Sequence, residues 1–155
     1  MAALDDGPAG GERAPFEGVD DQLMEQARVA RDRAYAPYSS FRVGAALRTA
    51  GGSIVTGCNV ENASFGLTLC AERSAVVAAV GQGEREFTGL ALATDGDTPV
   101  MPCGACLQVL AEFAEELPIS IVGRGETRLD TNLAALLPSA FGPKDLDRAR
   151  GEGAS

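Results

Sequence analysis

Cysteine placement constrains the fold of this chain more than any other feature. Cys70 opens an apolar, alanine-rich stretch at 70–80, and Cys103 and Cys106 open a second one at 103–115. Both stretches repeat apolar residues at helical spacing, which predicts two buried helices with cysteine in the first turn of each. Side chains three positions apart share one face of a helix, so Cys103 and Cys106 can bind a single ion together. For Cys70 to join them, the fold must bring two helix starts together.

The rest of the sequence alternates between helical and extended patterns. The Ala-Gly-Gly-Ser stretch at 50–53 offers the positive backbone angles of a hairpin between two strands. The order of elements predicts an α/β protein with a three-layer α/β/α fold and a central mixed five-stranded sheet. The predicted helices are 20–34, 70–80, 103–115 and 133–137, and the predicted strands are 41–49, 54–60, 88–94, 119–122 and 127–131.

Length and composition indicate one domain. The 155 residues, 45% of them hydrophobic and 23% charged, suffice for a single core, which we place at residues 18–143. Residues 1–17 combine Gly, Pro and charge without periodicity and are expected to be disordered, and residues 144–155 are expected to form a flexible tail. No apolar run approaches the roughly 20 residues of a membrane span. The chain also lacks a secretory signal, so we expect a cytoplasmic protein without membrane contact.

Charge and residue usage exclude several classes of function. A formal net charge of −9 argues against a nucleic-acid partner, because phosphate contacts need clustered cations, and favours a small neutral ligand. The chain contains no histidine, which excludes Ser-His-Asp and Cys-His catalysis and any zinc site that needs imidazole. Four cysteines without a secretory signal favour metal binding or catalysis over a disulfide framework.

Three thiolates from Cys70, Cys103 and Cys106 would hold one zinc ion and leave a fourth, open position for water. The positive end of each helix dipole favours the thiolate form. Three thiolates exceed the charge of the ion by about one unit, so a compensating cation is needed, and Arg73 is placed to donate to the sulfurs. Glu72 lies two residues after Cys70, close enough to take the proton of the bound water and later deliver it to a substrate.

Simpler interpretations exist for each of these residues. A Cys-x-x-Cys pair by itself is more often a structural zinc knuckle or a redox pair, and Glu72 could be an ordinary carboxylate at a helix start. A structural site normally has a fourth protein ligand, and the remaining cysteine, Cys58, is better explained as a small buried apolar residue. A protein that uses zinc only to hold its fold is therefore the alternative outside catalysis.

Five segments extend the pattern beyond the cysteines. AYAPYSSFRVGAAL, GCNVENASFG, LCAERSA, PCGACLQVL and LLPSAFGPKDL follow one another in unbroken order across roughly residues 22–148. Together they resemble the small, homotetrameric, zinc-dependent cytidine deaminases. The resemblance implies the cytidine deaminase-like fold, one zinc ion per subunit, and hydrolysis of cytidine and 2′-deoxycytidine to uridine and 2′-deoxyuridine with release of ammonia, a reaction of pyrimidine salvage.

The resemblance also implies roles in binding the nucleoside. Phe41 would pack near the base, Asn59 and Glu61 would hold the ribose hydroxyls, and Ala71 would offer its backbone to the pyrimidine. In the homotetramer, neighbouring subunits complete each active site. Phe65 and Phe141 would reach across to the ligand of a partner subunit.

Two positions depart from the family pattern. Leu107 stands directly after the last cysteine, where the family usually has arginine, and Phe65 stands where tyrosine is usual. A modified nucleoside or a cytosine-containing antibiotic is a second possible substrate of the same mechanism. A deaminase that edits RNA or DNA is disfavoured by the acidic composition.

Overall fold

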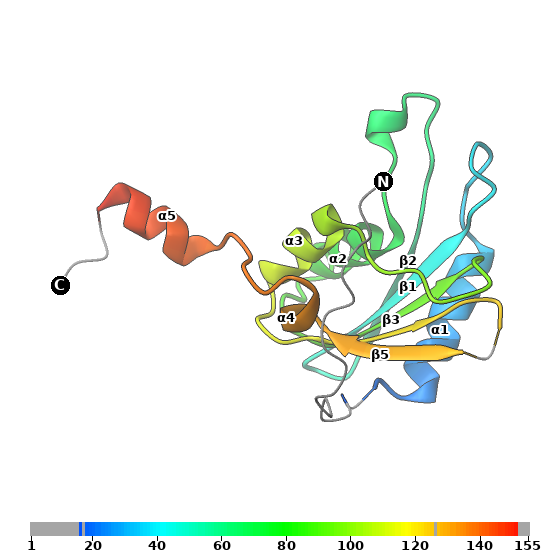
Figure 1. Ribbon diagram of the computed structural model, residues 1–155, viewed down its shortest axis with the longest axis horizontal. Helices are drawn as coiled ribbons and strands as arrows, with labels where there is room; N and C mark the ends of the chain where they lie inside the picture. Colours follow the sequence, from blue (N-terminus) through cyan, green and yellow to red (C-terminus); the bar gives the residue numbers. More distant parts are fainter. Residues whose placement is uncertain (1–15, 17, 126, 152–155) are drawn as a thin grey trace, which may run out of the picture.

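The computed structural model describes residues 16, 18–125 and 127–151. The fold has one mixed sheet with helices on both faces (Figure 1). The strand order is β2-β1-β3-β4-β5; β3 and β4 are parallel, and the other neighbouring pairs are antiparallel. The strands are β1 (Val43–Thr49), β2 (Ile54–Cys58), β3 (Phe87–Thr94), β4 (Pro118–Val122) and β5 (Arg128–Asn132). The helices are α1 (Asp21–Asp32), α2 (Ala71–Gly81), α3 (Gly104–Ala111), α4 (Leu133–Leu136) and α5 (Pro143–Arg150), with a 3-10 turn η1 at Phe65–Leu67.

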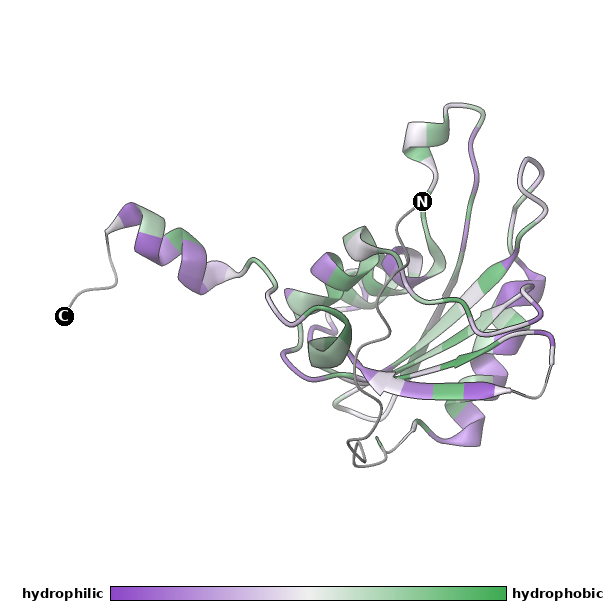
Figure 2. Cartoon of the chain, in the orientation of Figure 1, coloured by the Kyte–Doolittle hydropathy of each residue, from purple (hydrophilic) through white to green (hydrophobic). Residues whose placement is uncertain are grey.

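The prediction of an α/β fold with a mixed five-stranded sheet is confirmed. Successive strand residues point to opposite faces, and the two faces belong to two separate apolar clusters. Leu90 and Leu92 pack with α2 and α3, whereas Ala91 and Ala93 pack with α1. Figure 2 shows the apolar residues concentrated on the strands and on the helix faces turned toward them. The result is the predicted arrangement of three layers.

Helix α1 lies within the predicted helix at 20–34 and buries Leu23, Met24, Ala27 and Ala30. The carboxylate of Asp20 accepts a hydrogen bond from the backbone of Leu23 at 2.9 Å and caps the helix start. α1 ends at Asp32, slightly before the predicted boundary and ahead of Pro37. It crosses β1 closely at Gly44, where a Cβ atom would lie 2.7 Å from the Cα of Arg31 and closer still to the carbonyl of Ala27.

A second close approach sets the position of α2. A Cβ atom on Gly57 of β2 would lie 2.7 Å from the carbonyl oxygen of Ala71 and closer still to the backbone nitrogen of Ala75. Real side chains do not tolerate such contacts with backbone, so glycine lets the first turns of α2 rest directly on the sheet. The N-cap residue of α2 is Cys70, and that of α3 is Cys103. Both predicted cysteine clusters therefore lie at helix starts.

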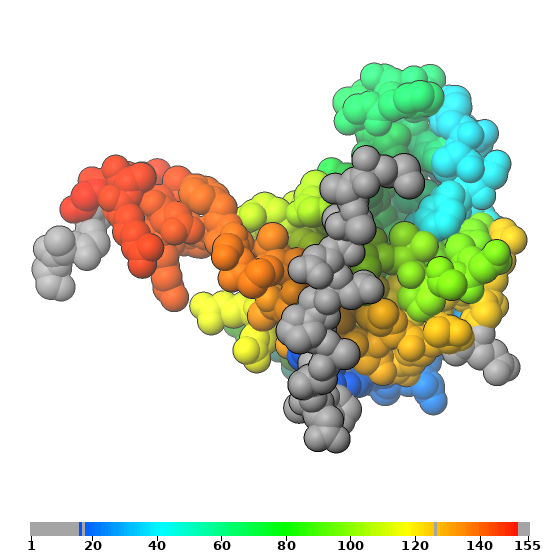
Figure 3. Space-filling view, in the orientation of Figure 1, coloured from blue at the N-terminus to red at the C-terminus, as the bar shows by residue number. Residues whose placement is uncertain are grey.

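The structure differs from the sequence prediction at two helices. α3 ends at Ala111 instead of residue 115, because the chain turns at 112–113 to bring Phe113 onto Phe87 at 5.5 Å between ring centres. The stretch predicted as a flexible tail contains α5, which starts with Pro143 and is followed by Gly151 with a φ of 75°. α5 extends away from the body of the protein (Figures 1 and 3), and none of its residues is buried.

Two further sequence predictions concern regions beyond the described structure. Most of the expected disordered segment, residues 1–15 and 17, lies outside the described residues, as do residues 152–155 of the expected tail. Within the described ranges, each helix is too short or too polar to cross a membrane.

Candidate metal site and active site

Three sulfurs converge where the first turns of α2 and α3 meet. The Sγ atoms of Cys70, Cys103 and Cys106 all lie within 4.8 Å of one another, and those of Cys103 and Cys106 are 3.4 Å apart. Ligand sulfurs of a tetrahedral zinc ion, each about 2.3 Å from the metal, would be roughly 3.8 Å apart. The three side chains therefore fit one zinc ion, and the structure brings together the trio that the sequence predicted.

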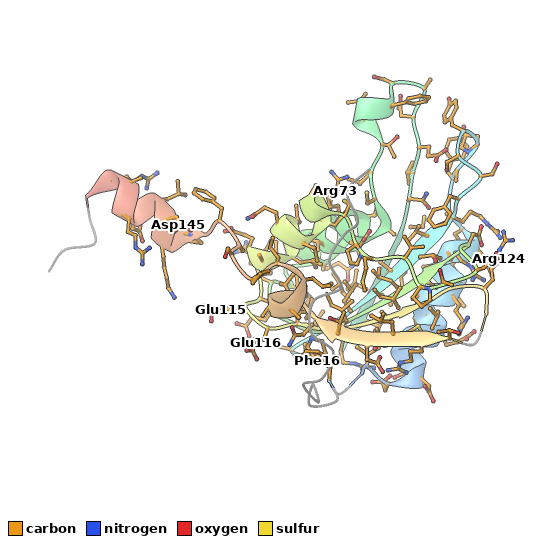
Figure 4. All side chains as sticks on the ribbon, in the orientation of Figure 1. Phe16, Arg73, Glu115, Glu116, Arg124 and Asp145 are labelled. Carbon is orange, nitrogen blue, oxygen red and sulfur yellow. The ribbon has the colours of Figure 1, made fainter. Side chains whose placement is uncertain are left out.

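Arg73 of α2, labelled in Figure 4, supplies a positive charge next to these sulfurs. Its Nη2 donates to Cys70 Sγ at 3.2 Å. Hydrogen bonds to the Cys70 sulfur, and secondarily to that of Cys106, raise the pKa of Arg73 above its ordinary value, so the guanidinium stays charged. Its Nε is buried and has no hydrogen-bond partner among the described residues, which leaves a donor available beside the sulfurs. This arrangement matches a cation that compensates thiolate ligands.

The two cysteines of α3 differ in their acidity. Burial raises the pKa of Cys106 far above that of an ordinary thiol, and the negative charge of Glu72 is the second largest cause of the increase. Burial also acts to raise the pKa of Cys103, but hydrogen bonds from the Cys106 backbone and from neighbouring sulfurs outweigh it and lower that pKa. A divalent cation between the sulfurs would favour the thiolate form of each cysteine. The donor set therefore suits a site that holds a metal.

Glu72 lies in the first turn of α2 and is only 5% exposed. Burial raises the pKa of its carboxyl group, against smaller opposing contributions from hydrogen bonds and from Arg73. A raised pKa brings a carboxyl group closer to the pH range in which it can both accept and donate a proton, as general acid–base catalysis requires. The predicted proton carrier thus lies beside the predicted metal ligands.

A cavity of about 290 Å³ opens next to this cluster. Its lining includes Cys70, Cys103 and Glu72, and Asn59 and Glu61 contribute from the loop after β2. The structure therefore joins the predicted metal, proton-transfer and ribose-binding residues in one concave site. The lining residues are Ser39, Phe41, Val43, Asn59, Glu61, Thr68, Cys70, Ala71, Glu72, Leu92, Thr94, Val100, Met101 and Cys103.

Asn59 has a structural role that the sequence did not reveal. Its Oδ1 accepts from the backbone of Val43 at 2.8 Å, and its Nδ2 donates to the carbonyl of Phe41 at 2.9 Å. The side chain thereby holds the start of β1 against the end of β2. One amide hydrogen of Asn59 stays free of these two bonds for a ligand in the cavity.

Glu61 is held in a similar way. It accepts hydrogen bonds from the backbone nitrogens of Tyr38 at 2.8 Å and Ser39 at 3.2 Å, and from the Ser39 hydroxyl. The bond from the Ser39 hydroxyl is the main cause of the lowered pKa of Glu61, which therefore stays ionised at neutral pH. A carboxylate has more acceptor positions than these three donors occupy, so it can also bind a hydroxyl group.

Phe65 and Phe141 do not line the cavity of their own chain. Phe65 is 73% exposed and meets Tyr38 edge-on, with 5.6 Å between ring centres. It contributes to an adjoining cavity of about 380 Å³ that shares Ser39, Glu61 and Thr68 with the first. Phe141 is 58% exposed, and its backbone is bound by the Gln108 side chain. Their role at a partner's site stays a prediction.

Sequence reasoning missed the part of the cavity wall made by Val100 and Met101. Both belong to the loop between β3 and α3, and their only sequence signal is their position just before Cys103. Leu107, one of the two departures from the family pattern, is buried in the apolar cluster between α2, α3 and the sheet. It therefore contributes to packing instead of to charge balance.

Residues 18–120 match the family model of the cytidine and deoxycytidylate deaminase zinc-binding region. The chain belongs to this family. Membership and the three-cysteine geometry together identify zinc as the metal cofactor and the protein as a zinc-dependent hydrolase of the cytidine deaminase family.

Relatives in this family are similar over most of their length. The chain is 45% identical to the cytidine deaminase of Sporosarcina psychrophila over 83% of this chain and 96% of that protein, and 45% identical to the cytidine deaminase of Mycobacterium tuberculosis over 84% and 95%. Among solved structures, cytidine deaminase from Burkholderia pseudomallei matches with a TM-score of 0.76 at 44% identity, covering 79% of this chain and 99% of that one. The crystal structure of the Mycobacterium tuberculosis enzyme matches with a TM-score of 0.69 at 44% identity, covering 79% and 96%.

Proposed function

We propose that this protein hydrolyses cytidine and 2′-deoxycytidine to uridine and 2′-deoxyuridine with release of ammonia, as a step of pyrimidine salvage. One observation carries the proposal: a buried glutamate, Glu72, lies beside three converging cysteine sulfurs at the wall of a cavity of about 290 Å³. That volume is at the lower end for small-molecule sites and suits a compact ligand. The similarity to named cytidine deaminases supports the choice of substrate.

Cys70, Cys103 and Cys106 would hold the zinc ion, which lowers the pKa of a water molecule and so supplies a nucleophile at neutral pH. Glu72 takes a proton from the attacking water and passes it to N3 of the ring while the bond from oxygen to C4 forms. It then moves the second proton from the new hydroxyl group on C4 to the exocyclic nitrogen. As the C4–N bond breaks, the C4 carbonyl forms and ammonia leaves. Arg73 offsets the excess negative charge of the three thiolates.

The other cavity residues would orient the nucleoside. Ala71 is the first residue of α2, so its N–H has no acceptor within the helix and can donate to the pyrimidine. Phe41 would pack near the base, and Asn59 and Glu61 would bind the ribose hydroxyls with the bonding capacity left by their backbone contacts. These contacts would fix the orientation of the nucleoside, so that the reaction takes place at one position of the ring.

The cavity favours a nucleoside over a nucleotide. Within the described part of the chain, neither cavity is lined by lysine or arginine, and both contain the ionised Glu61. A phosphate group near this carboxylate would be repelled with no cation to compensate. We expect cytidine and 2′-deoxycytidine to be deaminated and their 5′-monophosphates to react much more slowly. Equal rates on both would contradict this reading of the cavity.

We further propose that the active form is a homotetramer in the cytoplasm with active sites completed by neighbouring subunits. Tyr38, Phe65 and Leu67 form a group of exposed, mostly apolar residues beside the cavity mouth, and Phe141 is exposed near α3. Exposed apolar patches of this kind are typical of protein–protein contacts. A reducing compartment suits a site made of free thiols.

Replacing Glu72 by alanine tests the central proposal. We expect Glu72→Ala to keep its zinc and its assembly state but to lose ammonia release from cytidine, because only the proton carrier is removed. Glu116→Ala, at an exposed glutamate outside the cavity, is the matched control and should behave like the wild type. If Glu72→Ala released ammonia at the wild-type rate, Glu72 would have no part in the mechanism, and a purely structural zinc site would gain support.

A further inference from the structure

The loop between β3 and α3 carries both a wall of the cavity and a metal ligand. It begins at Asp95 and ends at Cys103, and Val100 and Met101 within it line the cavity. Residues 95–103 contain no helix or strand. The position of the loop therefore depends on specific contacts made where it leaves the sheet.

The side chain of Asp95 is the first of these contacts. It is only 5% exposed, and its Oδ2 accepts from Nε of Arg42 at 2.8 Å. Its Oδ1 lies 3.8 Å from Nε of Arg31 and 3.8 Å from Nε of Arg124. Arg31 belongs to α1, Arg42 immediately precedes β1, and Arg124 lies in the β4–β5 turn, at the edge of the molecule in Figure 4. One buried carboxylate thus ties the start of the loop to three separate elements.

The backbone of the β4–β5 turn provides the second contact. The nitrogen of Arg124 donates to the carbonyl of Gly96 at 2.8 Å. A Cβ atom on Gly123 would lie 2.9 Å from the carbonyl oxygen of Thr98 and closer still to that of Gly96. Gly125 in the same turn differs, because its Cβ would lie 3.5 Å from the carbonyl of Asp97, an ordinary contact. Of these two glycines, only Gly123 is required for the loop to rest on the turn.

We propose that Asp95 and Gly123 are positioning residues that set the placement of Val100, Met101 and Cys103 through this loop. The inference rests on the proposed function and extends it to residues that touch neither metal nor substrate. A displacement of the loop would move one metal ligand and one cavity wall together. Shifts of about 1 Å at an active site can cost about a hundredfold in rate, and disturbed ligand support typically costs about ten- to a hundredfold in metal affinity.

The glycine pair allows a test without any change of charge. We expect zinc-loaded Gly123→Ala to lose zinc to a chromogenic chelator at least about tenfold faster than wild type and to raise KM for cytidine by a similar factor. Gly125→Ala should stay within about twofold of wild type in both measurements, because its Cβ makes only an ordinary contact. Zinc release needs no catalytic turnover, so it reports on the loop independently of the reaction.

An aspartate pair tests the ion cluster. Asp95→Asn removes the shared counter-charge of three arginines, whereas Asp130→Asn weakens a comparable contact to Arg128 at 2.7 Å on the edge strand β5. We expect faster zinc release and a raised KM only for Asp95→Asn. Each variant is measured at a temperature equally far below its own melting midpoint.

The proposal is overturned if Gly123→Ala and Asp95→Asn release zinc and bind cytidine like their matched controls. Such a result would leave both residues with a role in overall stability alone. A wild-type enzyme inactive on cytidine, but with the expected order of zinc release, would refute the proposed function and support the positioning role.

Discussion

Replacement of Arg73 by glutamine tests whether the positive charge of this residue stabilises three thiolates and one divalent ion in a partly buried site. The guanidinium donates to Cys70 Sγ at 3.2 Å, and its contacts with the sulfurs raise its pKa, so it stays positively charged beside them. Two unit charges about 4 Å apart interact by about 4 kcal/mol at an effective dielectric constant of about 20. Solvent reaches part of Arg73, and hydrogen bonds to charged groups contribute a net of about 1.5–3 kcal/mol. We therefore expect a loss of about 2 kcal/mol in zinc binding, or about thirtyfold in Kd.

Competition with a chelator of known affinity, at fixed pH, measures this difference directly. Arg85→Gln removes an exposed arginine before β3 and serves as the control for the general loss of one positive charge. It should leave the zinc affinity unchanged within about twofold, because charges far from the metal are screened by salt. If Arg73→Gln bound zinc as tightly as Arg85→Gln, the charge of Arg73 would not be needed to balance the thiolates, and the electrostatic reasoning would be refuted.

Three further predictions follow from other parts of the fold. Gly57→Ala should lower the free energy of unfolding by about 1–3 kcal/mol, measured by denaturant titration, because the new Cβ collides with the backbone of Ala75; an unchanged midpoint would show that α2 can lift from the sheet without cost. Burial acts to raise the pKa of Asp95, but the contacts with Arg42 outweigh burial, so the folded-state pKa lies below its ordinary value. The free energy of unfolding that Asp95 adds over Asp95→Asn should therefore be present above the unfolded-state pKa and disappear as pH falls through the folded-state pKa. A difference in unfolding free energy that does not depend on pH would contradict this. Phe65→Glu should reduce the assembly mass in light scattering, whereas Gln82→Glu at another exposed position should not; an intact tetramer in Phe65→Glu would exclude that side chain from the interface.

Local chemistry explains which features could be predicted from the sequence. Neighbouring residues and apolar periodicity account for three features of the fold. These are the capped start of α1, the hairpin between β1 and β2, and the helix starts at Cys70 and Cys103. α5 also has local signals in the sequence, Pro143 at its start and Gly151 at its end, within a segment of polar composition.

The sequence alone determined the chemical nature of the site. With histidine absent, three cysteines and a glutamate at helix starts left few possibilities other than a thiolate-bound metal with a carboxylate as proton carrier. Residue types carry this information because ligand softness and proton affinity are properties of individual side chains.

Only the tertiary structure decided how the site is held in place. Asp95 meets three arginines, Gly123 supports a loop, and Gly57 admits α2, each through contacts between segments that are distant in the sequence. No spacing rule predicts such contacts, because they arise from how the sheet and helices pack and from where no side chain fits between them. Asn59 illustrates the same point: its polarity suggested ligand binding, and the fold shows that it also holds β1 against the end of β2.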